Sequence, residues 1–201
     1  MLSNRGCDLS YEDYLAEWEA AFDLFVERSI ESLDEFSMDQ LCFHFLSTNL
    51  SSQPNASSVV AFRDAYLEEW SQGVSYIPKL DVLLDDLASR YRLSVVSNTH
   101  HEPLVTGLLE RAGILDFFAS VTTSVEHGRR KPCPTIYQRA LSVTGCDPDR
   151  GLFVGDSFQD DYLGPRSVGL QALLIDPGAL EDVPDEHRLH SVLDLRERIA
   201  A

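Results

Sequence analysis

The chain has 201 residues, of which 44% are apolar and 24% are charged, and this composition indicates a folded globular protein rather than a disordered one. Its formal net charge of −17 excludes an extended positive surface for nucleic acid or anionic lipid. No apolar run approaches the roughly 18 residues of a membrane span, and no secretory signal pattern is visible at the N-terminus. We therefore expect a cytoplasmic protein that binds neither nucleic acid nor membrane.

The basic residues and the cysteines add two further expectations. Only Lys79 and Lys131 are lysines, and the other 14 basic residues are arginines. A lysine-poor acidic protein suggests adaptation to high salt, with compositional drift as the alternative. The cysteines form no CxxC pair and have no histidine at zinc-ligand spacing, which indicates reduced thiols. They are Cys7, Cys42, Cys133 and Cys146.

The first part of the chain has the spacing of amphipathic helices. Apolar residues recur every three or four positions over residues 11–33, and Ser10 is placed to cap this helix. Ser37-Met-Asp-Gln40 has the form of a capping box and predicts the start of a second helix. A third helix is expected over about residues 58–71. These patterns predict a small helical domain over residues 1–76.

After residue 77, helical patterns alternate with short apolar runs, which is typical of a parallel sheet with crossover helices. The expected order is helix 79–90, strand 93–97, helix 103–112, strand 118–122, helix 134–143, strand 151–154, helix 160–167 and strand 171–175. Residues 181–190 are expected to form a solvated loop before a last helix over about 191–199. The sequence thus predicts an α/β domain over residues 77–201, whose ligands gather at the carboxyl ends of the strands.

Polar residues follow two of these strands and precede one helix. Ser97-Asn98-Thr99 ends one strand, Lys131 stands before a helix, and Asp156 follows another strand. Each segment alone is typical of an ordinary turn or helix entry. Together they supply hydroxyl, amide, ammonium and carboxylate groups that suit a phosphoryl group and Mg²⁺. We expect Asp156 to bind Mg²⁺, and Asp160 or Asp161 to bind it or orient its water.

This order of residues resembles the haloacid dehalogenase-like hydrolase superfamily over nearly the whole chain. Val95-Val-Ser-Asn-Thr99 looks like motif II of that family, and the stretch around Lys131 from Gly128 to Tyr137 looks like motif III. Val154-Gly-Asp-Ser-Phe-Gln-Asp-Asp161 looks like motif IV. The resemblance implies a Rossmann-like parallel sheet with helices on both faces and a small helical cap.

The resemblance also implies roles for individual residues. Ser97 would hydrogen-bond the transferring phosphoryl group, with Asn98 and Thr99 beside it as substrate-binding residues. Lys131 would neutralise charge on the nucleophile and on the phosphoryl oxygens. Asp156 would bind Mg²⁺ and Asp161 would support it.

Motif I is the main departure from the family pattern. Family members begin with an apolar strand that ends in Asp-x-Asp-x-Thr, whose first Asp attacks phosphorus. Asp8 has no apolar strand before it and no second Asp two residues later, so we do not assign it as the nucleophile. In this family that strand lies between the strands of motifs II and IV. We therefore expect the sheet to lack its central strand. A truncated or mis-started reading frame is favoured, and the alternatives are that the gap is closed by collapse, by the N-terminal segment or by another chain.

The expected function is a Mg²⁺-dependent phosphatase for a small phosphorylated metabolite, with the nucleophile absent from this chain. The alternative is a non-catalytic protein that keeps the phosphate and metal pocket. A dehalogenase would need the missing Asp and would not need Mg²⁺, so the motif IV carboxylates favour phosphoryl chemistry. Unpaired strand edges would favour a homodimer. The sequence does not indicate which metabolite is bound.

Other residues are expected to be structural. His100 and His101 are interpreted as a solvated loop pair, and His44 as a helix residue without a ligand partner. Trp18 and Trp70 are expected in the core of the helical domain.

Overall fold

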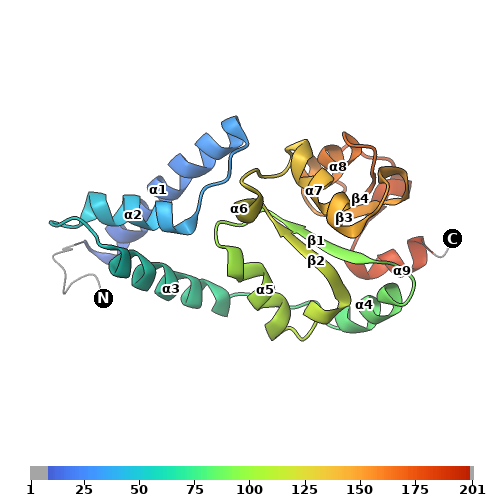
Figure 1. Ribbon diagram of the computed structural model, residues 1–201, viewed down its shortest axis with the longest axis horizontal. Helices are drawn as coiled ribbons and strands as arrows, with labels where there is room; N and C mark the ends of the chain where they lie inside the picture. Colours follow the sequence, from blue (N-terminus) through green and yellow to red (C-terminus); the bar gives the residue numbers. More distant parts are fainter. Residues whose placement is uncertain (1–8, 200–201) are drawn as a thin grey trace. The chain divides into compact units, whose positions relative to one another are not determined.

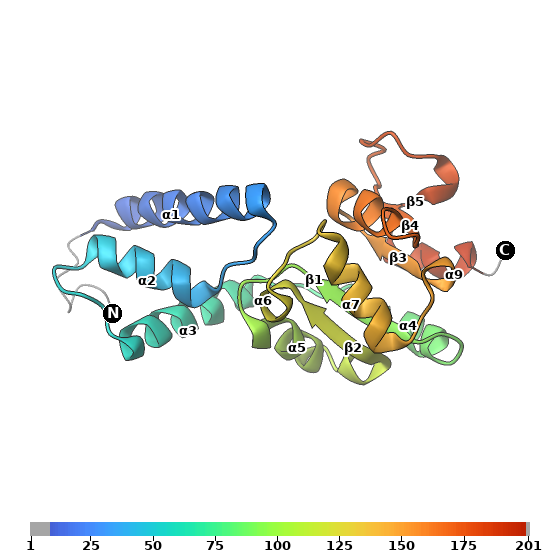
Figure 2. The same ribbon diagram turned by 45° about the horizontal axis from the view of Figure 1, so that its top comes forward.

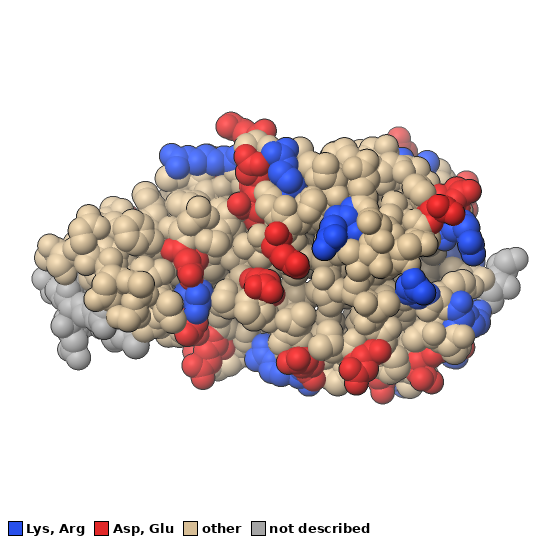
Figure 3. Space-filling model, in the orientation of Figure 1, with Lys and Arg blue, Asp and Glu red and all other residues tan. Residues whose placement is uncertain are grey.

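The computed structural model describes residues 9–199. The chain divides into two compact units, Met1–Ser75 and Tyr76–Ala201, whose elements are drawn in Figures 1 and 2. Cys7 and Asp8 lie outside the described residues. Within the described part of the chain, every helix is too short or too polar to traverse a membrane. Acidic and basic side chains are interspersed over the face drawn in Figure 3.

From residue 9 onward, the N-terminal unit contains three helices, each begun by a side-chain cap. They are α1 (Tyr11–Ser32), α2 (Met38–Asn49) and α3 (Ala56–Gln72). Ser10 caps α1, and both bonds of the expected capping box form between Ser37 and Gln40, at 2.8 and 3.2 Å. Helix α3 begins two residues earlier than expected because Asn55 caps it by accepting a hydrogen bond from the Ser58 N–H.

Aromatic rings form the core of this unit. The buried Trp18 ring lies 5.3 Å from the ring of Phe45 and 5.5 Å from that of Phe62, so the expectation for Trp18 is confirmed. Trp70 is 48% exposed, and its expected place in the core is wrong. The buried residues of α3 end at Leu67, so the apolar stripe continues beyond the packed part of the helix. His44 packs against the ring of Phe25, at 5.6 Å.

The C-terminal unit alternates helices and strands. Its elements are α4 (Leu80–Ala88), β1 (Leu93–Ser97), α5 (Glu102–Arg111), β2 (Phe118–Thr123), α6 (Ser124–His127), α7 (Pro134–Thr144), β3 (Leu152–Gly155), α8 (Gly164–Arg166), β4 (Gln171–Ile175), β5 (Arg188–Leu189) and α9 (Leu195–Arg198). The strands expected over 93–97 and 171–175 are confirmed. The helix expected over 160–167 begins instead as a π-helical turn, Phe158–Leu163. The expected last helix is shorter, with a 3₁₀ turn before α9.

The strand pairs within residues 9–199 are all parallel, which confirms the expected α/β class. Strand β1 pairs with β2, and β4 lies between β3 and β5. Helices α5 and α7 cover opposite sides of the β1–β2 pair in Figures 1 and 2, as in a doubly wound fold. Among the described residues, β1 and β3 thus belong to different sheets. The absence of a central motif I strand stays a prediction.

Strand β4 is buried on both faces, as its continuous apolar run indicates. Leu173 packs into a cluster with leucines of α4, β5 and α9. Ala172 and Leu174 point the other way and pack against Tyr162 and Val183. The period-2 alternation of a strand therefore joins two apolar layers, and it fixes β4 in the middle of its sheet.

Residues 181–190 are only in part the expected solvated loop, because most of them are exposed but Val183 and Leu189 are buried. They include β5, and their polar groups surround the buried carboxylate of Asp176. This carboxylate accepts hydrogen bonds from the N–H groups of Leu180 and Glu181, at 3.0 and 3.1 Å, and from Arg188 Nε, at 3.3 Å. The two backbone hydrogen bonds, with a further contribution from Arg188, lower the pKa of Asp176. Tertiary hydrogen bonds thus order a run whose composition is typical of a loop.

We expect the stability contributed by Asp176 to depend on pH. Its pKa is lower in the folded state, so the stabilisation is complete above the unfolded pKa of about 3.9 and is lost as pH falls through the folded value. Urea unfolding should therefore show Asp176→Asn to be clearly less stable than the wild type at pH 7, with the difference shrinking below pH ~4.

The matched control is Asp185→Asn, because the Asp185 carboxylate also pairs with Arg188, at 2.8 Å, but is 98% exposed. This variant should lose much less stability at pH 7. An equal loss in both variants, or a difference for Asp176→Asn that persists at pH 2, contradicts the assignment.

Candidate functional site

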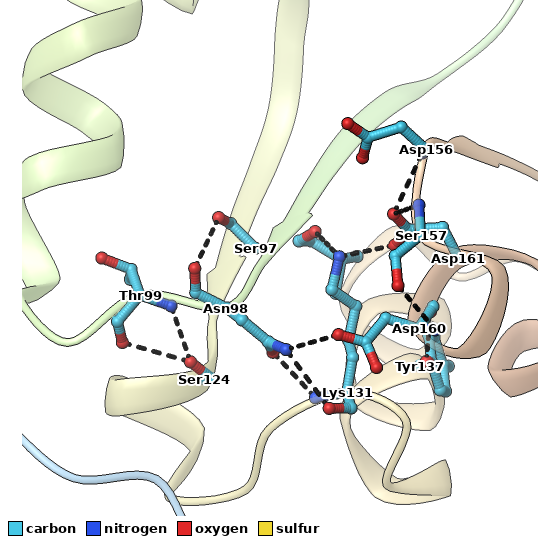
Figure 4. Close-up of polar contacts among 11 residues, drawn as sticks. Ser97, Asn98, Thr99, Ser124, Lys131, Tyr137, Asp156, Ser157, Asp160 and Asp161 are labelled. Carbon is cyan, nitrogen blue, oxygen red and sulfur yellow. Dashed lines mark hydrogen bonds and ion pairs between the residues drawn. The ribbon is translucent and has the colours of Figure 1, made fainter. Parts of the chain in front are cut away.

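The polar residues expected to form a site lie at the carboxyl ends of β1 and β3 and in the segment before α7 (Figure 4). Strand β1 ends at Ser97, and Asn98 and Thr99 follow it. Strand β3 ends at Gly155 and is followed directly by Asp156. The two strand ends lie close together because Lys131 contacts both Val96 and Asp161, and ligands of α/β proteins bind at such ends.

Lys131 joins the two strand ends. Its Nζ donates to the carboxylate Oδ1 of Asp161 at 2.6 Å and to the backbone carbonyl of Val96 at 3.2 Å. The side chains of Lys131 and Asp161 are only 11% and 7% exposed, so this ion pair is buried. The ammonium also lies 5.6 Å from the centroid of the Phe153 ring. These contacts hold one positive charge in a fixed place between β1 and β3.

Asp161 also orders the turn after β3. Its Oδ2 accepts hydrogen bonds from the N–H groups of Asp156, at 3.2 Å, and Ser157, at 3.1 Å. The carboxylate lies so close to Gly155 that a Cβ atom there would be 2.4 Å from its Cγ. Glycine is therefore required at this position by close approach, and the Gly-Asp-Ser sequence is explained by packing as well as by chemistry.

Asn98 fixes the segment that carries Lys131. Its side-chain Oδ1 accepts from the N–H of Lys131 at 2.8 Å, and its Nδ2 donates to the carbonyl of Lys131 at 3.2 Å. Nδ2 also donates to Oδ2 of Asp160 at 3.1 Å. Burial raises the pKa of Asp160, although Lys131 acts in the opposite direction. The amide thus connects the end of β1 to both the lysine and the motif IV helix.

Tyr137 is a member of this network that we did not assign from the sequence. It is fully buried on α7, and its hydroxyl donates to the backbone carbonyl of Asp160 at 2.5 Å. A Cβ atom at Gly164 would lie 2.1 Å from this hydroxyl. The signal was present, because Tyr137 lies within the motif III stretch and in the first turns of the helix that follows Lys131.

Two other predicted residues, Ser97 and Thr99, are not part of this network. The hydroxyl of Ser97 donates to the carbonyl of Asn98 at 3.3 Å, not to Lys131. Thr99 is buried, and its hydroxyl bonds the backbone of His101. The structure therefore brings together Asn98, Lys131 and two carboxylates, and leaves Ser97 and Thr99 beside them.

The donor set suits Mg²⁺ only in part. Asp156 is exposed, and Figure 4 shows its carboxylate pointing away from Asp161. Both oxygens of Asp161 are engaged by Lys131 and the turn after β3. Within residues 9–199, no group of three or more His, Cys, Asp or Glu side chains is arranged to hold a metal. Mg²⁺ retains several waters and needs only one or two carboxylates, so Asp156 fits its chemistry.

The protein is a doubly wound α/β protein. A buried lysine–carboxylate pair lies at its strand ends. The sequence profile described as "Haloacid dehalogenase-like hydrolase" matches residues 19–175. The chain belongs to this family, which confirms the resemblance in its motifs.

Individual relatives agree with this placement. "Haloacid dehalogenase-like hydrolase domain-containing protein 3" of Bos taurus is 37% identical over 110 residues, which are 52% of this chain and 43% of the relative. The "Glyceraldehyde 3-phosphate phosphatase" of Methanothermobacter thermautotrophicus is 37% identical over 123 residues, 59% of this chain and 52% of the relative. The chain thus spans about half the length of these curated relatives.

A solved structure supports the fold. The 2-haloacid dehalogenase of Pseudomonas syringae pv. Tomato DC3000 matches with a TM-score of 0.69 at 22% identity. The match covers 96% of this chain and 81% of that protein. At this identity the similarity establishes the fold alone.

Proposed function

We propose that the C-terminal unit carries the phosphate- and Mg²⁺-binding part of a phosphatase site for a small phosphomonoester. The observation that supports this most strongly is the buried ammonium of Lys131, held between the Val96 carbonyl and Asp161. A fixed positive charge at the carboxyl ends of parallel strands suits a phosphoryl group. The similarity to a glyceraldehyde 3-phosphate phosphatase agrees with a small phosphorylated substrate.

Each residue of the site would have its own role. Lys131 would neutralise charge on the phosphoryl oxygens, and it needs no reorganisation because Asp161 and the Val96 carbonyl already orient it. Asn98 would keep the backbone of Lys131 in place. Ser97, at the end of β1, would donate a hydrogen bond from its hydroxyl to a phosphoryl oxygen. Thr99 would fix the loop beside it. The helical unit would correspond to the cap domain of this family.

Asp156 is the residue we propose to hold Mg²⁺, because its carboxylate is exposed at the end of β3. Asp161 would support this role by fixing the N–H groups of Asp156 and Ser157. Asp160 is the second candidate, although its carboxylate accepts from Asn98. When bound, the ion supplies Lewis acidity and neutralises the charge of the phosphate.

The nucleophile is the part of the site that the sequence does not supply. Family members use the first Asp of an Asp-x-Asp-x-Thr segment, and the 201 residues contain no such segment after an apolar strand. We propose that this chain, assayed alone, binds phosphate without turning over phosphomonoesters.

The second candidate is a non-catalytic protein that binds phosphate and Mg²⁺, and the missing motif I favours it. The retained set of Ser97, Lys131, Asp156 and Asp161 favours the phosphatase, because a protein released from catalysis has no need to keep all four. The nucleotide sequence upstream of the Met1 codon discriminates between the two proposals. In-frame codons upstream of Met1 that encode an apolar run ending in Asp-x-Asp would establish the phosphatase.

Hydrolysis of p-nitrophenyl phosphate with Mg²⁺ tests the chain directly. The wild type and Lys131→Ala should show the same background rate, because loss of a covalent nucleophile typically costs several orders of magnitude. Robust wild-type turnover that disappears in Lys131→Ala would mean that another residue of this chain is the nucleophile.

A further inference from the structure

One buried hydroxyl connects the end of β2 to the loop that follows β1. Ser124 is the first residue of α6 and is fully buried. Its Oγ accepts a hydrogen bond from the N–H of Thr99 at 2.9 Å and donates to the carbonyl of the same residue at 3.2 Å. The last paired residues of the two strands are Ser97 and Thr123. The Ser124 side chain therefore holds the β1 chain two residues beyond the end of the backbone ladder.

The residue held in this way is next to Asn98. Both polar ends of the Asn98 side chain contact the backbone of Lys131, and its Nδ2 also contacts Asp160. The direction of the Asn98 side chain depends on the peptide that links it to Thr99. A rotation of that peptide would move the amide away from Lys131, so the Ser124 contacts restrain the lysine through two intermediate residues.

We infer that Ser124 is a positioning residue for phosphate binding. It acts by holding the N–H and the carbonyl of Thr99, and this N–H belongs to the Asn98–Thr99 peptide. Pre-organised groups bind an anion more tightly than groups that must be ordered during binding. This inference rests on the proposed function, since it concerns the same phosphate site.

The same strand provides matched controls. Ser120, in the middle of β2, pairs its hydroxyl with that of Ser94 at 2.8 Å. Thr123, the neighbour of Ser124, is equally buried, and its hydroxyl has no hydrogen-bond partner in the described structure. Ser120→Ala removes a hydroxyl contact away from the site, and Thr123→Val removes an adjacent hydroxyl that makes no hydrogen bond in the described structure.

Titration calorimetry of inorganic phosphate into the full chain with Mg²⁺ tests the inference, at a temperature where all variants are folded. Ser124→Ala should weaken phosphate binding roughly tenfold, the factor that corresponds to one or two hydrogen bonds. Ser120→Ala and Thr123→Val should stay within about twofold of the wild type, even if Ser120→Ala lowers the melting temperature. Unchanged phosphate affinity in Ser124→Ala would overturn the inference.

A double substitution separates positioning from a general structural effect. If Ser124 acts through Asn98, adding Ser124→Ala to Asn98→Ala should cause no further loss of phosphate affinity. Independent losses that add in the double variant would show that Ser124 does not act through Asn98. A wild type that fails to bind phosphate in the presence of Mg²⁺ would overturn the proposed function and, with it, this inference.

Discussion

Asp161→Asn is expected to lower the free energy of unfolding by about 3 kcal/mol. The substitution leaves the ammonium of Lys131 buried without its carboxylate partner, and Lys131 is only 11% exposed. It also weakens the acceptor for the N–H groups of Asp156 and Ser157. Equilibrium unfolding in urea at pH 7 measures the change.

An exposed ion pair provides the control. Asp39 contacts Arg63 at 2.7 Å, a distance close to that of the buried pair, but its side chain is 51% exposed. Asp39→Asn should cost less than about 1 kcal/mol because water screens the pair. Similar losses for the two variants would show that the Lys131–Asp161 pair does not behave as a buried one.

Gly155→Ala is expected to destabilise the protein by about 1–3 kcal/mol. Its Cβ atom would lie 2.4 Å from the carboxylate of Asp161, which would have to move away from the turn after β3. The same displacement would disturb the contact with Lys131. Thermal unfolding, with phosphate titration as a second readout, measures both effects.

Gly107→Ala is the matched control for this substitution. Gly107 lies inside α5, and a Cβ atom there would meet nothing within 4 Å. Alanine in a helix interior is more favourable than glycine by about 0.5–1 kcal/mol, so this variant should be slightly more stable than the wild type. Equal destabilisation by the two alanines would rule out the steric explanation for Gly155.

The elements predicted best are those whose patterns depend on local sequence. Strand β4 follows from a continuous apolar run, and the start of α2 follows from the reciprocal bonds of Ser37 and Gln40. Strand β5 was missed because it has two residues and sits in a polar run. Its order depends on Asp176, which meets Arg188 only in the folded chain.

Only part of the candidate site could be predicted from the sequence. Its positions at the strand ends could be predicted from the order of Asn98, Lys131 and the motif IV carboxylates. The sequence could not show which carboxylate pairs with Lys131, because Asp160 and Asp161 are adjacent and differ only in the direction that the π-helical turn gives them. The contribution of Tyr137 likewise depends on how α7 packs beside that turn.

Phosphate affinity with and without Mg²⁺ tests the central claim most directly, namely that these residues form a phosphate and Mg²⁺ site. Titration calorimetry of the wild type should show binding that is about tenfold or more weaker in excess chelator than with Mg²⁺, because the ion neutralises phosphate charge in a strongly acidic protein. Asp156→Asn should bind phosphate equally weakly in both conditions. Wild-type binding that is undiminished in chelator, or a full Mg²⁺ response in Asp156→Asn, would contradict the claim.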